Sequence, residues 1–175
     1  MKKWKTLKRI EKTRSIIFKH EVVERSSDSG LNGLFDVVHC LNWVNVIAIT
    51  KNDEVLLVKQ YRHGVNEITY ETPGGAVEPG EDTLLAAKRE LQEETGYGKG
   101  NWSKLGVVDV NPAFMSNRCS FYLAEDVEEV SPMNLDQLEE IELEKRSLAE
   151  IKKMIKQGEI SHSLVVSAFY YFDSR

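Results

Sequence analysis

Hydrophobic and polar positions repeat along the chain in two ways, with the alternation of β-strands and with the spacing of α-helices. Several predicted strands come before the first predicted helix. Alternating or continuous apolar runs predict strands over residues 14–25, 35–42, 43–50, 54–61, 66–72, 106–110, 118–126 and 141–147. The hairpin over residues 43–61 has β-branched apolar runs, which are typical of buried central strands. Ile17 and Val23 are expected to be buried. Residues 26–34 and 99–105 are expected to be loops.

Helical spacing appears three times. The segment Gly75–Tyr97 opens with a glycine-rich turn and continues as a helix, which Asp82 or Thr83 can cap and which Gly96 ends. A capping box at residues 147–150 opens a second helix that ends near residue 158, and residues 162–172 form a last, apolar helix. The order of strands, helix, strands and two helices predicts an α/β (α+β) fold with helices on a mixed sheet.

Composition places the chain in the globular class. Its 175 residues are 41% hydrophobic, enough for one domain with a full core. No run of 18 apolar residues predicts a membrane span, and the basic N-terminus lacks the apolar stretch of a secretory signal. Cys40 and Cys119 lack metal-ligand spacing and are expected to be free thiols, which favours a reducing, cytoplasmic setting.

Charge is distributed unevenly. Residues 1–25 hold nine Lys/Arg against three Glu, a net +6, so the remainder carries −11 of the total of −5. This basic arm lacks the glycine-rich or aromatic-interleaved character of nucleic-acid binders. Charge complementarity favours its lying against an acidic surface of the chain itself or of a partner subunit. We therefore expect neither a nucleic-acid nor a membrane partner.

Three glutamates crowd one face of the first helix. Glu90, Glu93 and Glu94 fall within about 100° of one another, and such like-charge neighbours destabilise a helix by a few tenths of a kcal/mol each. The neighbouring core-facing stripe contains Leu84, Ala87 and Leu91. One interpretation is a solvated acidic face. The other is a site for a hard cation such as Mg²⁺ or Mn²⁺, which prefers oxygen ligands.

The spacing around these glutamates favours the second interpretation. The fixed positions are Gly75, Glu81, Arg89, Glu90, Glu93, Glu94 and Gly96, followed by the large apolar-bodied Tyr97. This arrangement resembles the Nudix box, so the chain resembles a Nudix hydrolase. An aliphatic residue is more usual at the position of Tyr97, which is expected to pack rather than react.

The resemblance implies a fold, a cofactor and roles. The fold is an α/β/α sandwich with a mixed central sheet over residues 43–175, preceded by an antiparallel strand extension over residues 1–42. Two or more Mg²⁺ ions, or Mn²⁺, would be held by Glu90, Glu94, Glu93 and the Gly74 carbonyl. Glu81 would pair with Arg89 and orient the carboxylates, and Glu93 and Arg89 would serve catalysis. Gly75 and Gly96 would be structural.

The substrate class follows from segments outside the box. Residues 57–64 and 68–75 resemble the ADP-ribose pyrophosphatase and nucleotide-sugar branch, which implies that Arg62 and Glu71 contact substrate. Pro112 lies sixteen residues beyond Gly96, as in ADP-ribose hydrolases, and its loop carries Phe114. Individually, Arg62 is equally interpretable as a solvated loop cation and Pro112 as a turn former.

A distal general base in this branch comes from a flexible loop, which corresponds to residues 136–144. Gln137 falls at a commonly acidic position and cannot accept a proton, so the role moves to Glu139 or Glu140, with a slight preference for Glu140. Either glutamate is alternatively part of an acidic surface. His20, His39, His63 and His162 lack ligand spacing and receive no role.

The resemblance predicts a Mg²⁺-dependent pyrophosphatase that cleaves a nucleoside diphosphate sugar, with ADP-ribose first and GDP-mannose or other sugars next. The alternatives are a nucleoside triphosphate pyrophosphohydrolase and a non-catalytic nucleotide-sugar sensor. The branch also implies a homodimer formed through the N-terminal strands. Four aromatic residues are candidates for stacking on a base, although core positions are the more frequent outcome: Phe35, Trp43, Tyr61 and Phe114.

Overall fold

The computed structural model describes residues 3–175; the first two residues of the predicted basic arm lie outside it. Contacts divide the chain into two compact units. The first unit runs up to Asn42 and also includes Val108–Arg118. The second comprises Trp43–Val107 and Cys119–Arg175. Each unit is described by itself below.

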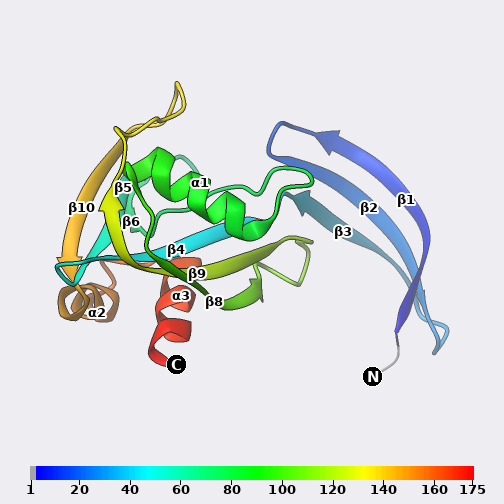
Figure 1. Ribbon diagram of the computed structural model, residues 1–175. Helices are drawn as coiled ribbons and strands as arrows, with labels where there is room; N and C mark the ends of the chain where they lie inside the picture. Colours follow the sequence, from blue (N-terminus) through cyan, green and yellow to red (C-terminus); the bar gives the residue numbers. More distant parts are fainter. Residues whose placement is uncertain (1–2) are drawn as a thin grey trace. The chain divides into compact units, whose positions relative to one another are not determined.

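The first unit is built on a three-stranded antiparallel sheet in the order β1–β2–β3 (Figure 1). The strands are β1 (Trp4–Arg14), β2 (Phe18–Ser27) and β3 (Asn32–Cys40). The sequence prediction of one strand over residues 14–25 was therefore wrong in its start and missed β1. The chain turns at residues 15–17, where the Ser15 amide donates to the Phe18 carbonyl at 2.8 Å.

The burial of this sheet explains the error. All eleven residues of β1 are exposed, and its pairing with β2 shifts register twice, so no clean alternation survives in the sequence. Val23 is fully buried, as predicted. Ile17 was predicted to be buried but is 73% exposed, because it lies in the turn rather than on a strand.

The second unit contains a mixed sheet in the order β10–β5–β4–β9–β7, with β6 paired to β5 and β8 to β9. Its strands are β4 (Trp43–Thr50), β5 (Glu54–Arg62), β6 (Glu67–Glu71), β7 (Tyr97–Gly98), β8 (Asn101–Asp109), β9 (Arg118–Glu129) and β10 (Ile141–Ser147). β4 runs parallel to β9 and antiparallel to β5. The predicted hairpin of buried central strands is confirmed, since β4 and β5 supply eight apolar residues that are each at most 1% exposed.

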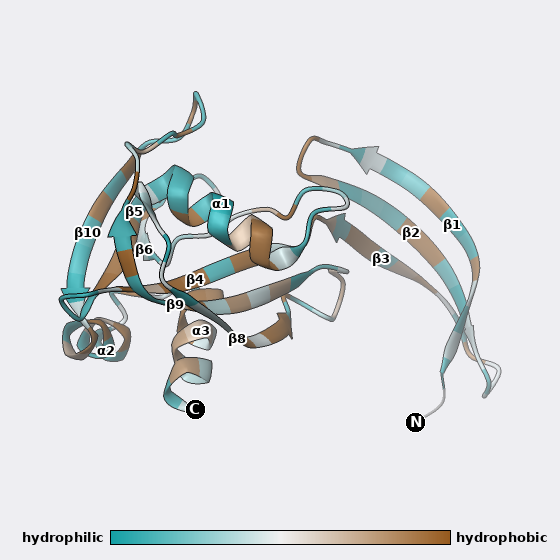
Figure 2. Cartoon of the chain, viewed as in Figure 1, coloured by the Kyte–Doolittle hydropathy of each residue, from teal (hydrophilic) through white to brown (hydrophobic). Residues whose placement is uncertain are grey.

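Three helices complete this unit: α1 (Thr83–Thr95), α2 (Leu148–Gln157) and α3 (Ser163–Asp173). Figure 1 shows α1 and α3 on opposite sides of β4, and both helices contact that strand. Figure 2 shows the hydrophobic colour concentrated along β4, with much of α1 hydrophilic. The capping box predicted at Ser147 and Glu150 opens α2. The mixed sheet with helices packed on it is thus confirmed.

In the loop predicted over residues 99–105, residues 101–105 are instead the start of β8, while residues 99 and 100 lie outside any strand. Pairing with β9 and the ring of Trp102 hold this segment, since Trp102 packs against the core and lies 5.7 Å from the Lys88 ammonium. Cys40 and Cys119 are free, as expected. Among residues 3–175, no helix combines the length and hydropathy needed to cross a membrane.

Candidate active site

α1 positions the acidic cluster, and its two ends are fixed by the residues that the sequence indicates. The Asp82 carboxylate accepts from the Leu84 and Leu85 amides at 2.8 and 3.3 Å, which satisfies donors at the start of the helix. Gly96 follows the helix with φ of 74°, the left-handed conformation that glycine adopts without strain. Leu91 is fully buried, so the opposite face of α1 is turned away from the core.

Arg89 connects the acidic side chains into one network. Its Nε and Nη2 donate to Glu81 at 3.0 Å each, and Nη1 donates to Glu90 at 2.8 Å and to Glu93 at 3.0 Å. Nη2 also donates to the Ala76 carbonyl at 3.1 Å. A guanidinium has five N–H donors, and here each has a protein acceptor. Arg89 therefore holds three carboxylates and has no donor left for a ligand.

Glu94 lies deepest in the cluster. It is 4% exposed and accepts from the Gly74 amide at 2.8 Å. Burial raises the pKa of Glu94 to about 8, and the negative charges of Glu90 and Glu139 contribute to the increase. Burial likewise raises the pKa of Glu90 despite its contact with Arg89. The protein alone therefore disfavours the ionised form of both carboxyl groups.

The two glycines before α1 are required by close approaches. A Cβ on Gly75 would lie 2.6 Å from the carboxylate of Glu90, and a Cβ on Gly74 would lie 2.0 Å from the Val44 carbonyl oxygen. The Gly75 carbonyl in turn accepts from the Val44 amide at 3.0 Å, which ties this turn to β4. Gly75 thus leaves the space in which Glu90 stands.

This donor set fits a hard divalent cation in its chemistry. Glu90, Glu93 and Glu94 offer carboxylate oxygens from one helix face, and burial disfavours the ionised forms of Glu90 and Glu94 unless a counter-charge is near. Within the described residues, no three acidic or imidazole side chains already converge as a metal cage. The reason is visible in the hydrogen bonds: Glu90 and Glu93 face Arg89, whereas Glu94 faces the Gly74 amide.

A second charged pair lies where β5 and β6 end. Arg62 donates from Nε and Nη2 to the two carboxylate oxygens of Glu71, both at 2.7 Å, and Thr69 donates to the same carboxylate at 2.7 Å. Glu71 is 4% exposed. Although burial opposes its ionisation, the hydrogen bonds from Arg62 and Thr69 prevail and lower the pKa of Glu71. The sequence interpretation of Arg62 as a solvated loop cation is therefore wrong.

Arg62, but not Glu71, lines a cleft of about 620 Å³. Arg62 lies over the indole of Trp43 at 6.0 Å from the ring centroid. On the side of α3 the cleft is lined by residues 161–163, and His162 Nε2 lies 3.9 Å from Glu71. Because Glu71 occupies one edge of the guanidinium, the Nη1 group of Arg62 remains for a ligand in the cleft.

The two candidates for a distal base, Glu139 and Glu140, both lie on the loop between β9 and β10, but their surroundings differ. The negative charge of Glu139 contributes to the raised pKa of both Glu90 and Glu94. Glu140 instead lines a groove with Lys59 and Tyr61. This electrostatic influence favours Glu139, whereas the sequence analysis slightly preferred Glu140.

The start of this loop is attached to the end of α1. The Asn134 amide donates to the Glu93 carbonyl at 2.8 Å, and the amides of Val130 and Ser131 donate to the Gly96 carbonyl at 2.8 and 3.2 Å. These bonds satisfy carbonyls that a helix end leaves free. They also fix the point from which the chain continues to Glu139.

The comparisons with known proteins agree with this geometry. The NUDIX domain model matches residues 42–167, which is most of the chain. The chain belongs to the Nudix family. It is a Nudix hydrolase, a pyrophosphatase, and its box residues lie on α1 and the turn before it.

Two relatives and one solved structure are similar to the chain over most of its length. The chain is 30% identical over 168 residues to the methanol dehydrogenase activator of Bacillus methanolicus, covering 95% of this chain and 91% of that one. It is 30% identical over 129 residues to the ADP-ribose pyrophosphatase of Bacillus subtilis, covering 73% and 70%. A crystal structure of an ADP compounds hydrolase superposes with a TM-score of 0.86 at 22% identity, covering 98% and 93%, which shows the shared Nudix fold.

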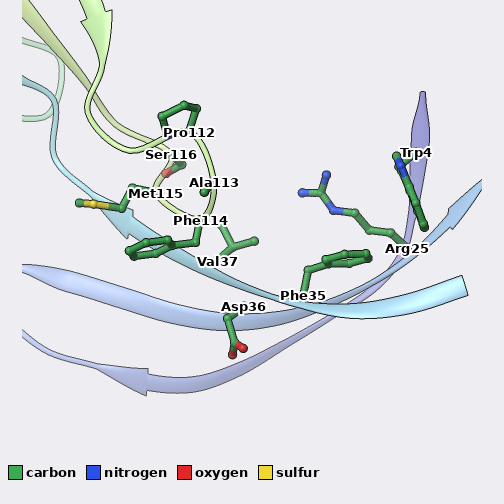
Figure 3. Close-up of a pocket in the computed structure, with 10 residues that line it drawn as sticks. All are labelled: Trp4, Arg25, Phe35, Asp36, Val37, Pro112, Ala113, Phe114, Met115 and Ser116. Atoms are coloured by element: carbon green, nitrogen blue, oxygen red, sulfur yellow. The ribbon is translucent and has the colours of Figure 1, made fainter. Parts of the chain in front are cut away.

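Two of the substrate-contact candidates of this Nudix hydrolase lie in the first unit. Pro112 and Phe114 line a pocket of about 330 Å³ (Figure 3). Trp4 and Phe35 meet edge to face in the same pocket, with ring centroids 5.3 Å apart, and Figure 3 shows the Arg25 guanidinium extending beside the Phe35 ring. The buried Nε of Arg25 has no hydrogen-bond partner in the described residues.

The aromatic candidates are not core residues. Phe35, Tyr61 and Phe114 are between 41% and 45% exposed, and Trp43 is half-buried at the cleft. The expectation that core positions are the more frequent outcome was wrong for these four. Tyr97, in contrast, is buried beneath the Lys145 ammonium, which confirms that it packs.

Sequence reasoning missed two residues of this region. His162 received no role because no second histidine or cysteine stands at ligand spacing, and Thr69 had no distinguishing feature. The available signal was positional: His162 begins the last helix, and Thr69 stands two residues before Glu71 and so on the same face of β6. Neither position identifies a partner on another element without the fold.

Proposed function

We propose that this Nudix hydrolase cleaves the diphosphate linkage of a nucleoside diphosphate sugar, with ADP-ribose as the first substrate, to a nucleoside monophosphate and a sugar phosphate. GDP-mannose and other nucleotide sugars come next. The observation that carries the proposal is the glutamate cluster organised by Arg89, in the same unit as the buried Arg62–Glu71 pair. The name of the Bacillus subtilis relative, ADP-ribose pyrophosphatase, supports the same substrate.

Glu90, Glu94, Glu93 and the Gly74 carbonyl are proposed to hold divalent cations, Mg²⁺ or Mn²⁺. The raised pKa of Glu90 and Glu94 supports this, because a cation would compensate two buried charges. Such ions supply neutralisation of the diphosphate and a lower pKa of water. Phosphoryl transfer otherwise depends mainly on positioning and charge stabilisation.

The other side chains are proposed to orient the glutamates, bind the substrate and accept a proton. Glu81 and Arg89 keep the glutamates oriented, since Arg89 has no donor free for substrate. Arg62 offers Nη1 to an anionic group of the substrate, while Glu71 fixes its orientation. Glu139 accepts the proton of the attacking water on a carboxylate oxygen, a role that the neighbouring Gln137 lacks the basicity to fill.

Pro112 and Phe114 are proposed as substrate contacts, and a homodimer is also proposed. Its support is β1, an eleven-residue strand that is exposed throughout and presents Trp4, Leu7 and Ile10 to solvent at 37% to 58% exposure. Light scattering coupled to size-exclusion chromatography measures the mass directly. A monomer at micromolar concentration would contradict the proposal.

Turnover of a substrate panel tests the function. ADP-ribose, GDP-mannose, dinucleotides and nucleoside triphosphates are incubated with protein and Mg²⁺, and phosphate is measured after phosphatase coupling. We expect nucleotide sugars to give the highest kcat/KM. Preference for triphosphates, or no cleavage of any diphosphate by folded protein, would refute the proposal. Glu94→Gln should lower kcat by orders of magnitude while the protein remains folded.

The distal base has a matched control in the next residue. Glu139→Gln should lower kcat by about 10²–10⁴-fold, the usual contribution of a general base. Glu140→Gln changes the same chemistry one position away and should leave kcat unchanged, because Glu140 lines a different groove. Equal rates for both variants and the wild type would remove Glu139 from the mechanism.

A further inference from the structure

His162 occupies the N-cap position of α3 and also borders the Arg62–Glu71 pair. Its Nδ1 accepts from the Leu164 amide at 3.2 Å, and its Nε2 lies 3.9 Å from the Glu71 carboxylate. The two ring nitrogens therefore face two different elements. Histidine is not among the residue types preferred at an N-cap, where serine, threonine, aspartate and asparagine prevail. Capping alone does not account for a histidine at this position.

The cap determines which nitrogen carries the proton. Because Nδ1 accepts a hydrogen bond from a backbone amide, its lone pair is in use, and the proton of the neutral ring resides on Nε2. The Nε2–H group then lies 3.9 Å from the Glu71 carboxylate, an electrostatic contact that is longer than a hydrogen bond. The N-cap residue of α3 thus directs an N–H group of fixed orientation toward Glu71, the carboxylate that orients Arg62.

Glu71 has room for this donor. Its Oε1 accepts from Arg62 and Thr69, whereas Oε2 accepts from Arg62 alone at 2.7 Å and is the atom nearest to His162. The His162 side chain is 27% exposed and Glu71 is almost completely covered. His162 therefore lies beside the carboxylate oxygen of Glu71 that accepts the fewer hydrogen bonds.

We propose that His162 is a positioning residue for substrate binding: its Nε2 edge holds Glu71, and Glu71 holds Arg62 toward the ligand, while its Nδ1 edge caps α3. The proposal rests on the proposed function for its kinetic test. It assigns to α3, which bears no residue of the acidic cluster, a direct influence on the affinity for substrate. The effect falls on KM, because His162 acts on Arg62 and not on the glutamates of α1.

Two substitutions separate the two nitrogens. Asparagine places a polar atom near the position of Nδ1 and is a strong N-cap, but it is too short to reach Glu71. Glutamine extends an amide N–H toward the position of Nε2 and is a poor cap. His162→Asn should therefore retain the melting temperature and lose the contact with Glu71. His162→Gln should lower the melting temperature and retain the contact.

Steady-state kinetics with ADP-ribose and Mg²⁺ give the first readout. For His162→Asn we expect KM to rise about tenfold with kcat within about twofold of wild type, which corresponds to about 1.4 kcal/mol of binding free energy. For His162→Gln we expect a KM near that of the wild type. An unchanged KM in His162→Asn, or an equal increase in both variants, would overturn the proposal, since the second result would indicate ring packing alone.

A second readout needs no turnover. The Nε–H of Arg62 donates to Glu71 at 2.7 Å and should give a slowly exchanging signal in ¹H–¹⁵N spectra, assigned by its loss in Arg62→Lys. Its exchange with water should accelerate in His162→Asn and stay slow in His162→Gln. If the wild type fails to cleave ADP-ribose, the proposed function fails, and this exchange rate still decides the role of His162. Identical exchange in all three proteins would refute it.

Discussion

Replacing Arg89 by lysine keeps the positive charge and removes the guanidinium, so it measures what the guanidinium hydrogen bonds contribute to the free energy of unfolding. Lysine has three donors where arginine has five, so at least two of the five hydrogen bonds of Arg89 are lost. Hydrogen bonds to charged groups contribute about 1.5–3 kcal/mol each when shielded from water. Because the side chains of Arg89 and Glu93 are 30% and 37% exposed, solvent offsets part of this, and we expect a net loss of about 2–4 kcal/mol.

Urea denaturation of the protein, followed by circular dichroism, measures this loss. Domains of this size unfold with about 5–15 kcal/mol, so the effect is a substantial fraction. The matched control is Arg175→Lys, because Arg175 pairs with Glu125 at 4.0 Å with both side chains well exposed, and it should change the free energy of unfolding by less than about 0.5 kcal/mol. If Arg89→Lys and Arg175→Lys are equally stable, the network does not stabilise α1. The kcat of Arg89→Lys should also fall, since Glu90 and Glu93 lose a common partner.

Three further outcomes follow from the structure. Gly75→Ala should lower kcat at least about tenfold while the melting temperature changes little, because the added Cβ displaces the Glu90 carboxylate rather than the core; full activity would show that Glu90 tolerates another position. The hydrogen bond from Lys19, with those from Arg9 and His39, lowers the pKa of Glu21 to about 2 from its usual 4.5. The contribution of Glu21 to stability is therefore present above pH 4.5 and lost as the pH falls toward 2. Glu21→Gln should make the melting temperature less dependent on pH across that range, and parallel pH curves for the variant and the wild type would contradict this. Removal of divalent ions with EDTA should abolish turnover, and added Mg²⁺ should restore it; activity that persists in EDTA would remove the metal assignment.

The sequence predicted α1 and its surroundings well, because local chemistry determines them. Asp82 caps the helix and Gly96 ends it through bonds within four residues, so both signals can be read without tertiary information. The alternation of β1 could not be read in the same way, since all of its residues are exposed and its register shifts twice. Exposure, rather than weak propensity, concealed that strand.

Contacts between distant segments were beyond the sequence for a different reason. Nothing in the spacing of Glu71 and His162, 91 positions apart, indicates that α3 brings the imidazole to the end of β6. The choice between Glu139 and Glu140 depends similarly on which side of the loop faces α1, and adjacent residues of a loop have no fixed period. The resemblance supplied the roles of the box residues, whereas the fold supplied their partners.

The attachment of Asn134 to the end of α1 has a consequence for how such an enzyme changes its substrate during evolution. The following segment is fixed at one end by Asn134 and at the other by the pairing of Ile141 with β5. Between these points, Leu138 is 95% exposed, and the free energy of closing a loop rises only slowly with its length. Insertions or deletions there would move an acidic side chain relative to the diphosphate without altering the metal-binding helix. The metal-binding helix and the loop that carries the proposed base can therefore change independently of each other.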